Sequence, residues 1–104
     1  MHTHQQIDRR SLEMARTIVA KIDRDPCRDG LRHARDVCRR WVEKGNIPAR
    51  EWLPLLEQPW EHVREILLDE TEEGQRLRQN DPFCGILTPR ERWDIYRKAQ
   101  CDAE

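Results

Sequence analysis

The side chains best suited to chemistry in this chain are its four cysteines and four histidines. That number is sufficient for a metal centre, but the sequence contains no CxxC or HxxxH spacing. Cys27 and Cys38, if both lay on one helix, would be about 16 Å apart, too far to share an ion. The spacing therefore predicts neither a metal site nor a cofactor. The chain also lacks a glycine-rich phosphate loop, since none of its four glycines falls in a GxGxxG or GxxxxGK pattern.

Cys84, followed by Gly85, is the most attractive nucleophile. Nucleophilic catalysis needs a base within hydrogen-bond reach and donors for a developing oxyanion. His33 or His62 would have to be brought to Cys84 by the fold, and nothing in their spacing requires this. A cysteine packed beside Phe83 in a loop explains the same residues, so we expect a protein that is not an enzyme.

Arginine usage is more informative, because 16 of the 19 basic residues are Arg and only 3 are Lys. Within the second expected helix, four of them follow one another at intervals of four, three and four residues: Arg28, Arg32, Arg35 and Arg39. Such a stripe suits the backbone of a nucleic acid or another polyanion. The interleaved acids Asp29, Asp36 and Glu43 favour a solvated face instead, so polyanion binding is the alternative prediction. The second and third expected helices, joined by a turn that contains Gly45, fit a DNA-reading helix-turn-helix poorly. Trp41 and Glu51 stand where that motif usually has a small residue and a branched apolar residue.

A second group of arginines flanks an apolar loop and an aromatic helix near the carboxyl terminus. If loop and helix fold together, Phe83, Trp93 and Tyr96 form an aromatic floor with guanidinium groups at its rim. Aromatic rings and Arg are the usual anchors of protein interfaces. The predicted partner-binding residues are Arg78, Phe83, Arg90, Arg92, Trp93 and Tyr96. The alternative prediction is that the three rings are buried in the core, because the chain has few other apolar residues to form one.

The same block, RLRQNDPFCGILTPRERWDIY, resembles the closing segment of small bacterial all-helical proteins to which no activity is assigned. The resemblance covers the last third of the chain and supplies no catalytic residue. It implies a bacterial, cytoplasmic origin. We therefore predict a non-enzymatic interaction module that binds a protein partner or a second copy of itself.

Six helical segments are expected to position these residues. Apolar spacing and breakers place them from Ile7 or Asp8 to Arg24, from Asp25–Pro26 or nearer Asp29 to Lys44, and over residues 49–58, 59–68, 69–77 and 88–100. Pro54 kinks or divides the third segment. Thr88 and Glu91 form a capping box for the last one. Residues 80–87 form an ordered loop, and no alternating pattern predicts a sheet.

Composition indicates one domain of 104 residues with a thin core, because apolar residues make up 37% and charged residues 38% of the chain. The near-neutral net charge of −1 argues against a general nucleic-acid coat. No stretch is apolar enough for a membrane span or a secretory signal, which predicts a cytoplasmic protein with reduced thiols. We expect an all-α bundle of five to six short helices over residues 1–104, with flexible ends at 1–6 and 101–104.

Overall fold

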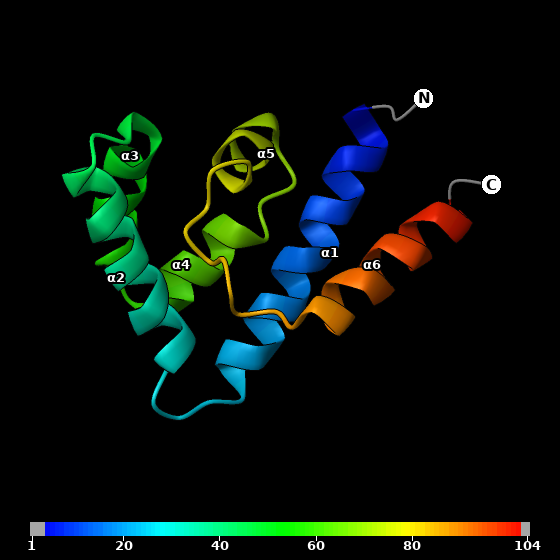
Figure 1. Cartoon of the computed structure of the whole chain (residues 1–104), viewed down its shortest axis with the longest axis horizontal. Coiled ribbons are helices and arrows are strands. Elements are labelled where there is room, and N and C mark those ends of the chain that lie inside the picture. Colours follow the sequence, from blue (N-terminus) through cyan, green and yellow to red (C-terminus); the bar gives the residue numbers. More distant parts are fainter. Residues whose placement is uncertain (1–3, 103–104) are drawn as a thin grey trace.

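Six helices form the computed structural model of this chain, which describes residues 4–102 and the side chains of residues 9–98. They are α1 (His4–Asp23), α2 (Asp29–Glu43), α3 (Ile47–Leu56), α4 (Trp60–Leu67), α5 (Glu72–Arg78) and α6 (Pro89–Asp102). The helices α2 and α3 pack along each other on one side, α1 and α6 on the other, and α4 and α5 lie between them (Figure 1). The described residues contain no strand, which confirms the all-α bundle. None of the described helices meets the length and apolarity that a membrane crossing requires.

The sequence signals locate most helix ends. Asn46 accepts a hydrogen bond from the Ala49 amide at 3.1 Å and caps α3, which continues through Pro54 and ends two residues later. The later of the two expected starts holds for α2, because the Asp25 carboxylate accepts from the amide of Asp29 at 2.8 Å and leaves Pro26 outside the helix.

The two terminal helices are longer than expected. Residues 4–6 and 101–102, expected at the flexible ends, belong to α1 and α6, and residues 1–3 and 103–104 lie outside the described part of the chain. The glutamines at positions 5 and 6 are good helix formers, and residues 4–6 include neither Pro nor Gly. Nothing in the sequence therefore requires α1 to begin only at Ile7.

The core centres on Trp52 of α3, which is 1% exposed. Its ring meets that of Phe83 edge to face, with 6.1 Å between centroids and 76° between planes. The thiol of Cys38 donates to the Ala49 carbonyl at 3.2 Å and ties α2 to α3. Around them pack the remaining core residues, Ala15, Ile18, Val19, Ile22, Leu31, Ala34, Leu56, Trp60, Val63, Leu67, Leu77 and Leu87.

Side chains outside each helix donate hydrogen bonds to the backbone carbonyls at the carboxyl ends of four helices. Arg28 donates to the carbonyls of Ile22 at 2.8 Å and Asp23 at 3.1 Å, at the end of α1. Arg35 donates through Nε to the Leu56 carbonyl at 2.6 Å, at the end of α3. The last carbonyls of a helix have no partner within it and carry the negative end of its dipole, so a guanidinium satisfies both needs.

The other two helix ends are closed in the same way. Arg78 donates to the Leu67 carbonyl at 3.2 Å and to the Asp69 carbonyl, just beyond α4. The Trp52 indole N–H donates to the Leu77 carbonyl of α5 at 2.9 Å. The bonds from Arg35 and Trp52 span 21 and 25 residues, so these two hold helices of the bundle together as well as capping them.

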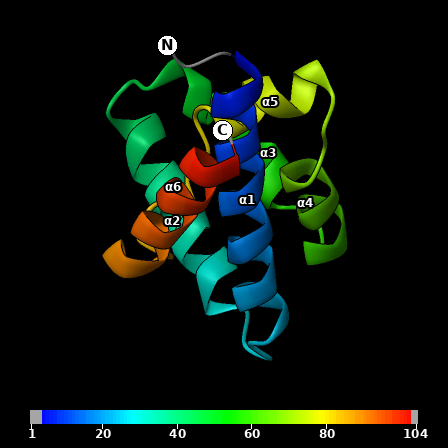
Figure 2. The same ribbon diagram turned by 90° about the vertical axis from the view of Figure 1, so that its right-hand side faces the viewer.

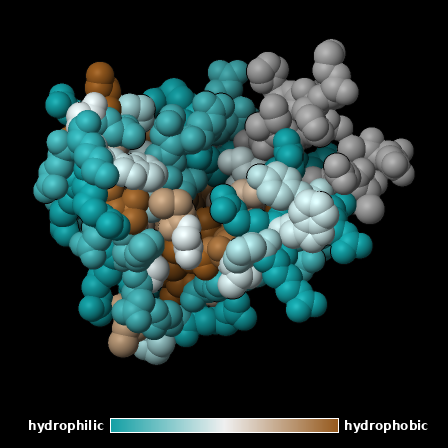
Figure 3. Space-filling model, viewed as in Figure 1, coloured by the Kyte–Doolittle hydropathy of each residue, from teal (hydrophilic) through white to brown (hydrophobic). Residues whose placement is uncertain are grey.

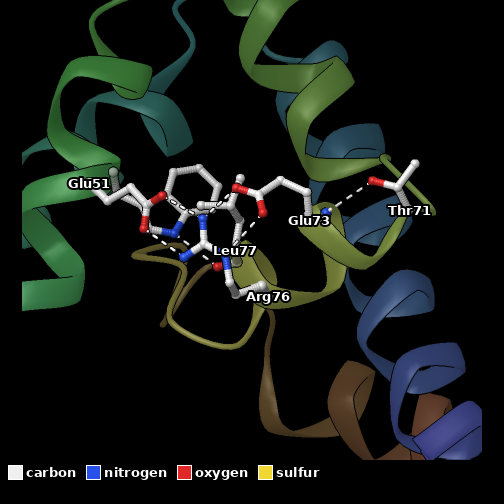
Figure 4. Close-up of polar contacts among 7 residues, drawn as sticks. Glu51, Thr71, Glu73, Arg76 and Leu77 are labelled. Atoms are coloured by element: carbon white, nitrogen blue, oxygen red, sulfur yellow. Dashed lines mark hydrogen bonds and ion pairs between the residues drawn. The ribbon is translucent and has the colours of Figure 1, made fainter.

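An exposed ion network adds a link between α3 and α5 (Figure 4). The Arg76 guanidinium donates two bonds to the Glu51 carboxylate, at 2.8 and 2.5 Å, and also binds Glu73 on its own helix. The bonds from Arg76 lower the pKa of both carboxyls below their ordinary values. Exposed ion pairs such as these contribute little to the free energy of unfolding. The main effect of the network is therefore to hold α5 in position against α3.

Replacing Gly74 with Ala tests the approach of α5 to the chain before it. A Cβ at this position would stand 2.1 Å from the Asp69 carbonyl oxygen, a backbone atom that Arg78 already holds. We expect the free energy of unfolding, measured by urea denaturation, to fall by about 2 kcal/mol or more.

The matched control is Gly45→Ala. Gly45 has φ +85° and nothing within 4 Å of an added Cβ, so only backbone strain of about 1 kcal/mol is expected. If both substitutions lowered the free energy of unfolding by the same amount, Gly74 of α5 would not lie in close contact with the Asp69 carbonyl.

Candidate functional site

The start of α6 is fixed by the capping box that the sequence predicts. The Thr88 amide donates to Glu91 Oε1 at 2.9 Å, and the Glu91 amide donates to Thr88 Oγ1 at 3.1 Å. Lys21 of α1 donates to the same Glu91 oxygen at 2.7 Å and to the Ile86 carbonyl at 2.9 Å. The Lys21 ammonium and the Thr88 amide lower the pKa of Glu91 to about 2. One lysine therefore orients both α6 and the loop that precedes it.

The outer face of α6 presents the most exposed aromatic ring among the described residues. Trp93 is 63% exposed, while Tyr96 is 38% exposed and lies under the Arg10 guanidinium of α1, 5.1 Å from the ring centroid. Within the described part of the chain, no ion pair engages the basic residues of this helix, Arg90, Arg92, Arg97 and Lys98. Arg90 and Arg92 are also exposed, and Arg90 lies one turn before Trp93 on the same side of α6.

Phe83 does not join this surface, which corrects the expected aromatic floor. It is 2% exposed and packs on Trp52, because the Asp81 carboxylate accepts from the Phe83 amide at 3.0 Å and turns the side chain inward. The alternative interpretation, that the rings are core, is right for Phe83 and wrong for Trp93.

Arg78 is likewise not at a surface rim. It is 4% exposed, and it donates to Ser11 Oγ at 3.1 Å in addition to the carbonyls that end α4. Burying a guanidinium is costly unless its donors are satisfied. Arg78 therefore has a structural role, because its hydrogen bonds join α5 to α1 and α4. The predicted set therefore reduces to Arg90, Arg92, Trp93 and Tyr96 at the surface.

A pocket of about 200 Å³ opens beside this surface, between α1, the loop of residues 80–88 and α6. Figure 3 shows apolar residues at the centre of this face, where the loop crosses in Figure 1, with polar residues around them. The pocket is lined by Met14, Ile18, Arg78, Gln79, Asp81, Phe83, Cys84, Gly85, Leu87 and Arg92. The sequence reasoning missed Met14, although it stands four residues before the core residue Ile18 and so shares its side of α1.

Among the described residues that line this pocket, Asp81 is the one carboxylate. Burial raises its pKa to about 6, against the opposing effects of the bond from the Phe83 amide and the charge of Arg78. In the sequence, Asp81 before Pro82 indicates only a break in helical structure. Its burial follows from the loop lying over α1, for which no local signal exists.

The arginine stripe of the second helix does not form as expected. Arg28 precedes α2 in a left-handed conformation, with φ 54°, and both Arg28 and Arg35 are engaged by the helix ends described above. Arg32 and Arg39 are exposed, and they pair with Asp29 at 3.8 Å and Asp36 at 3.3 Å. Arg32 also donates to the Cys27 carbonyl at 3.2 Å, so three of the four members bind backbone carbonyls.

The fold brings His33 to Cys84, but not as a catalytic pair. The His33 Nε2 lies 3.2 Å from the Cys84 carbonyl oxygen, so this nitrogen donates its proton to the backbone. Of the four cysteines, the structure gives Cys27, Cys38 and Cys84 as free thiols, and Cys101 lies outside the described side chains. Among the described residues, no group of three or more His, Cys, Asp or Glu side chains is arranged to hold a metal ion.

Comparison with known proteins finds no family, no curated protein and no solved structure that matches this chain. What the protein does is therefore inferred from its own residues.

Replacing Phe83 and Trp93 separately tests the division between core and surface. Phe83→Ala should lower the free energy of unfolding by about 3–5 kcal/mol, because it removes a buried ring and leaves a cavity. Trp93→Ala should change it by no more than about 0.5 kcal/mol, as is usual for an exposed position. Thermal and urea unfolding of both variants measure the difference, and a large loss with Trp93→Ala would place that ring in the core.

Asp81→Asn tests the buried carboxyl. A carboxyl whose pKa is higher in the folded than in the unfolded chain keeps its proton longer when folded, so stability falls as pH rises from about 4 to 6. The Asn side chain can accept the Phe83 amide without a charge. We expect this variant to match the native protein near pH 4 and to exceed its free energy of unfolding by about 1–2 kcal/mol at pH 7. A constant difference across this range would contradict the raised pKa.

Proposed function

We propose that this protein is a non-catalytic interaction module that binds an acidic protein surface through the outer face of α6. The observation that carries the proposal is Trp93, an exposed ring with the exposed Arg90 one turn before it on the same side of α6 and the exposed Arg92 next to it in the chain. Large exposed aromatic rings are costly to leave in water, and Trp and Arg are the residues that most often anchor protein interfaces. The proposal also keeps the bacterial origin and the cytoplasmic location expected from the sequence.

Charge supports an acidic partner. Arg10 of α1 lies over the Tyr96 ring, and α6 carries four basic residues, with the acids Glu91 and Asp94 among them. A larger group of acidic side chains lies on and around α4 and α5, at Glu57, Glu61, Glu65, Asp69, Glu70, Glu72 and Glu73, with Arg64 and Arg76 among them. Figure 2 shows α6 on one side of α1 and the helices α4 and α5 on the other. Complementary charge raises the rate of encounter and excludes basic partners.

The arrangement also restricts how a second copy would bind. The basic face of one copy would meet the acidic α4–α5 side of the next, which is a head-to-tail contact between different surfaces. Such a contact builds chains or rings, and not a symmetric dimer. The proposal therefore includes self-association as one form of binding to an acidic surface.

A photo-crosslinking residue at position 94, next to Trp93, tests the proposal in cells. We expect a covalent adduct with a polypeptide, or with the chain itself, and an affinity for the purified partner that falls about 30-fold or more with Trp93→Ala. Arg90→Glu should weaken the same complex without making a cavity. Sedimentation of the purified chain over a range of concentrations separates self-association from binding to another protein.

The control places the same crosslinker at Glu43, which is exposed on α2 and belongs neither to the α6 face nor to the acidic α4–α5 side. Adducts that form equally from both positions, or that persist in both variants, would refute the α6 interface. An adduct with nucleic acid whose affinity falls steeply with salt would instead support polyanion binding.

A further inference from the structure

The pocket between α1, the loop of residues 80–88 and α6 has an apolar floor and a charged rim. Met14 and Ile18 enter it from α1, and Phe83 and Leu87 from the loop. Its volume of about 200 Å³ exceeds the cavity of about 150 Å³ that accommodates a benzene molecule in an engineered core. One apolar side chain of the size of Leu or Phe therefore fills it.

The charges at the rim favour an anion. Arg92 is exposed and has no ion pair within the described part of the chain, so its five N–H donors face water. Arg78 and Asp81 also line the pocket, but Arg78 is 4% exposed and bonded to Ser11 and to the carbonyls that end α4, and Asp81 accepts from the Phe83 amide. The exposed guanidinium at the rim is therefore that of Arg92, and one carboxylate neutralises its charge.

The position of the pocket indicates what kind of molecule would bring an apolar side chain and a carboxylate to it. Arg92 belongs both to the pocket and to α6, and Trp93 follows it directly on that helix. A polypeptide whose last residue enters the pocket would leave it beside Arg92 and continue over the α6 surface. A small free acid would use the pocket without reaching Trp93.

We propose that this pocket binds the C-terminal residue of a polypeptide partner, with its apolar side chain against Met14, Ile18 and Leu87 and its carboxylate on Arg92. The inference rests on the proposed function, because it specifies the part of the partner that the module recognises. It adds a sequence requirement, namely a free carboxyl terminus that ends in a residue such as Leu or Phe.

The test uses a synthetic peptide, acetyl-Glu-Ser-Gly-Leu, as the free acid and as the C-terminal amide. In an NMR titration of the full chain, the acid should shift the amides of Leu87 and Arg92 and bind about tenfold more tightly than the amide, which lacks the charge. Acetyl-leucine represents the small free acid and should bind more weakly than the peptide. Equal affinities of the acid and the amide, or of acetyl-leucine and the peptide, would overturn the inference.

Two matched variants identify the residues responsible. Arg92→Gln should remove the preference for the acid. Arg97→Gln should keep it, because Arg97 is exposed on α6, lies outside the pocket lining and forms no ion pair with a described residue. Asp81→Asn should tighten the acid several-fold by removing a like charge, an effect that a purely structural role for Asp81 would not produce. Retention of the preference in Arg92→Gln would contradict the assignment.

The outcomes separate this inference from the function on which it rests. If Trp93→Ala and Arg90→Glu disrupt the complex formed in cells while the peptide does not contact the pocket, the α6 interface stands and the C-terminal inference fails. If the peptide binds through Arg92 while both α6 variants leave the cellular complex intact, the pocket stands and the proposed interface fails.

Discussion

The structure depends on how the carboxyl ends of its short helices are satisfied. Five of the six helices have only 7 to 15 residues, so the unpaired carbonyls at the end of each make up a large part of its length. Arg28, Arg35 and Arg78 donate to these carbonyls at the ends of α1, α3 and α4, and Trp52 does so at the end of α5. The bonds from Arg35 and Trp52 span 21 and 25 residues, so polar anchors supplement a small hydrophobic core.

This constraint explains why arginine content is a poor guide to function in this protein. A guanidinium carries several donors and a permanent charge, so it can close a helix end that a shorter or singly donating side chain would leave open. The residues that resemble a polyanion-binding stripe are in part these anchors. The basic residues of α6 make no such bond with the described residues, and this contrast, more than their number, distinguishes them as candidates for binding.

The fold was largely predictable because its signals are local. Apolar spacing at three and four residues, the caps at Asn46 and Thr88, and the turn at Gly45 each act over a few neighbours, and they locate the helices to within a few residues. The candidate site was predictable only in part. Arg90, Arg92 and Trp93 lie on a helix whose start is well marked, whereas Phe83 and Arg78 lie where the chain turns, and their burial depends on α1, α3 and α4 packing against them.

The sequence by itself determined that the chain is helical and that its last helix begins at a capping box. Only the tertiary structure decided which rings and which arginines face water, because residues on one stretch of chain are buried or exposed according to what packs on them from elsewhere. It also created the pocket beside α6, whose lining comes from positions as far apart as Met14 and Arg92. No local pattern records that meeting, since it arises only when Lys21 holds the loop and α6 against α1.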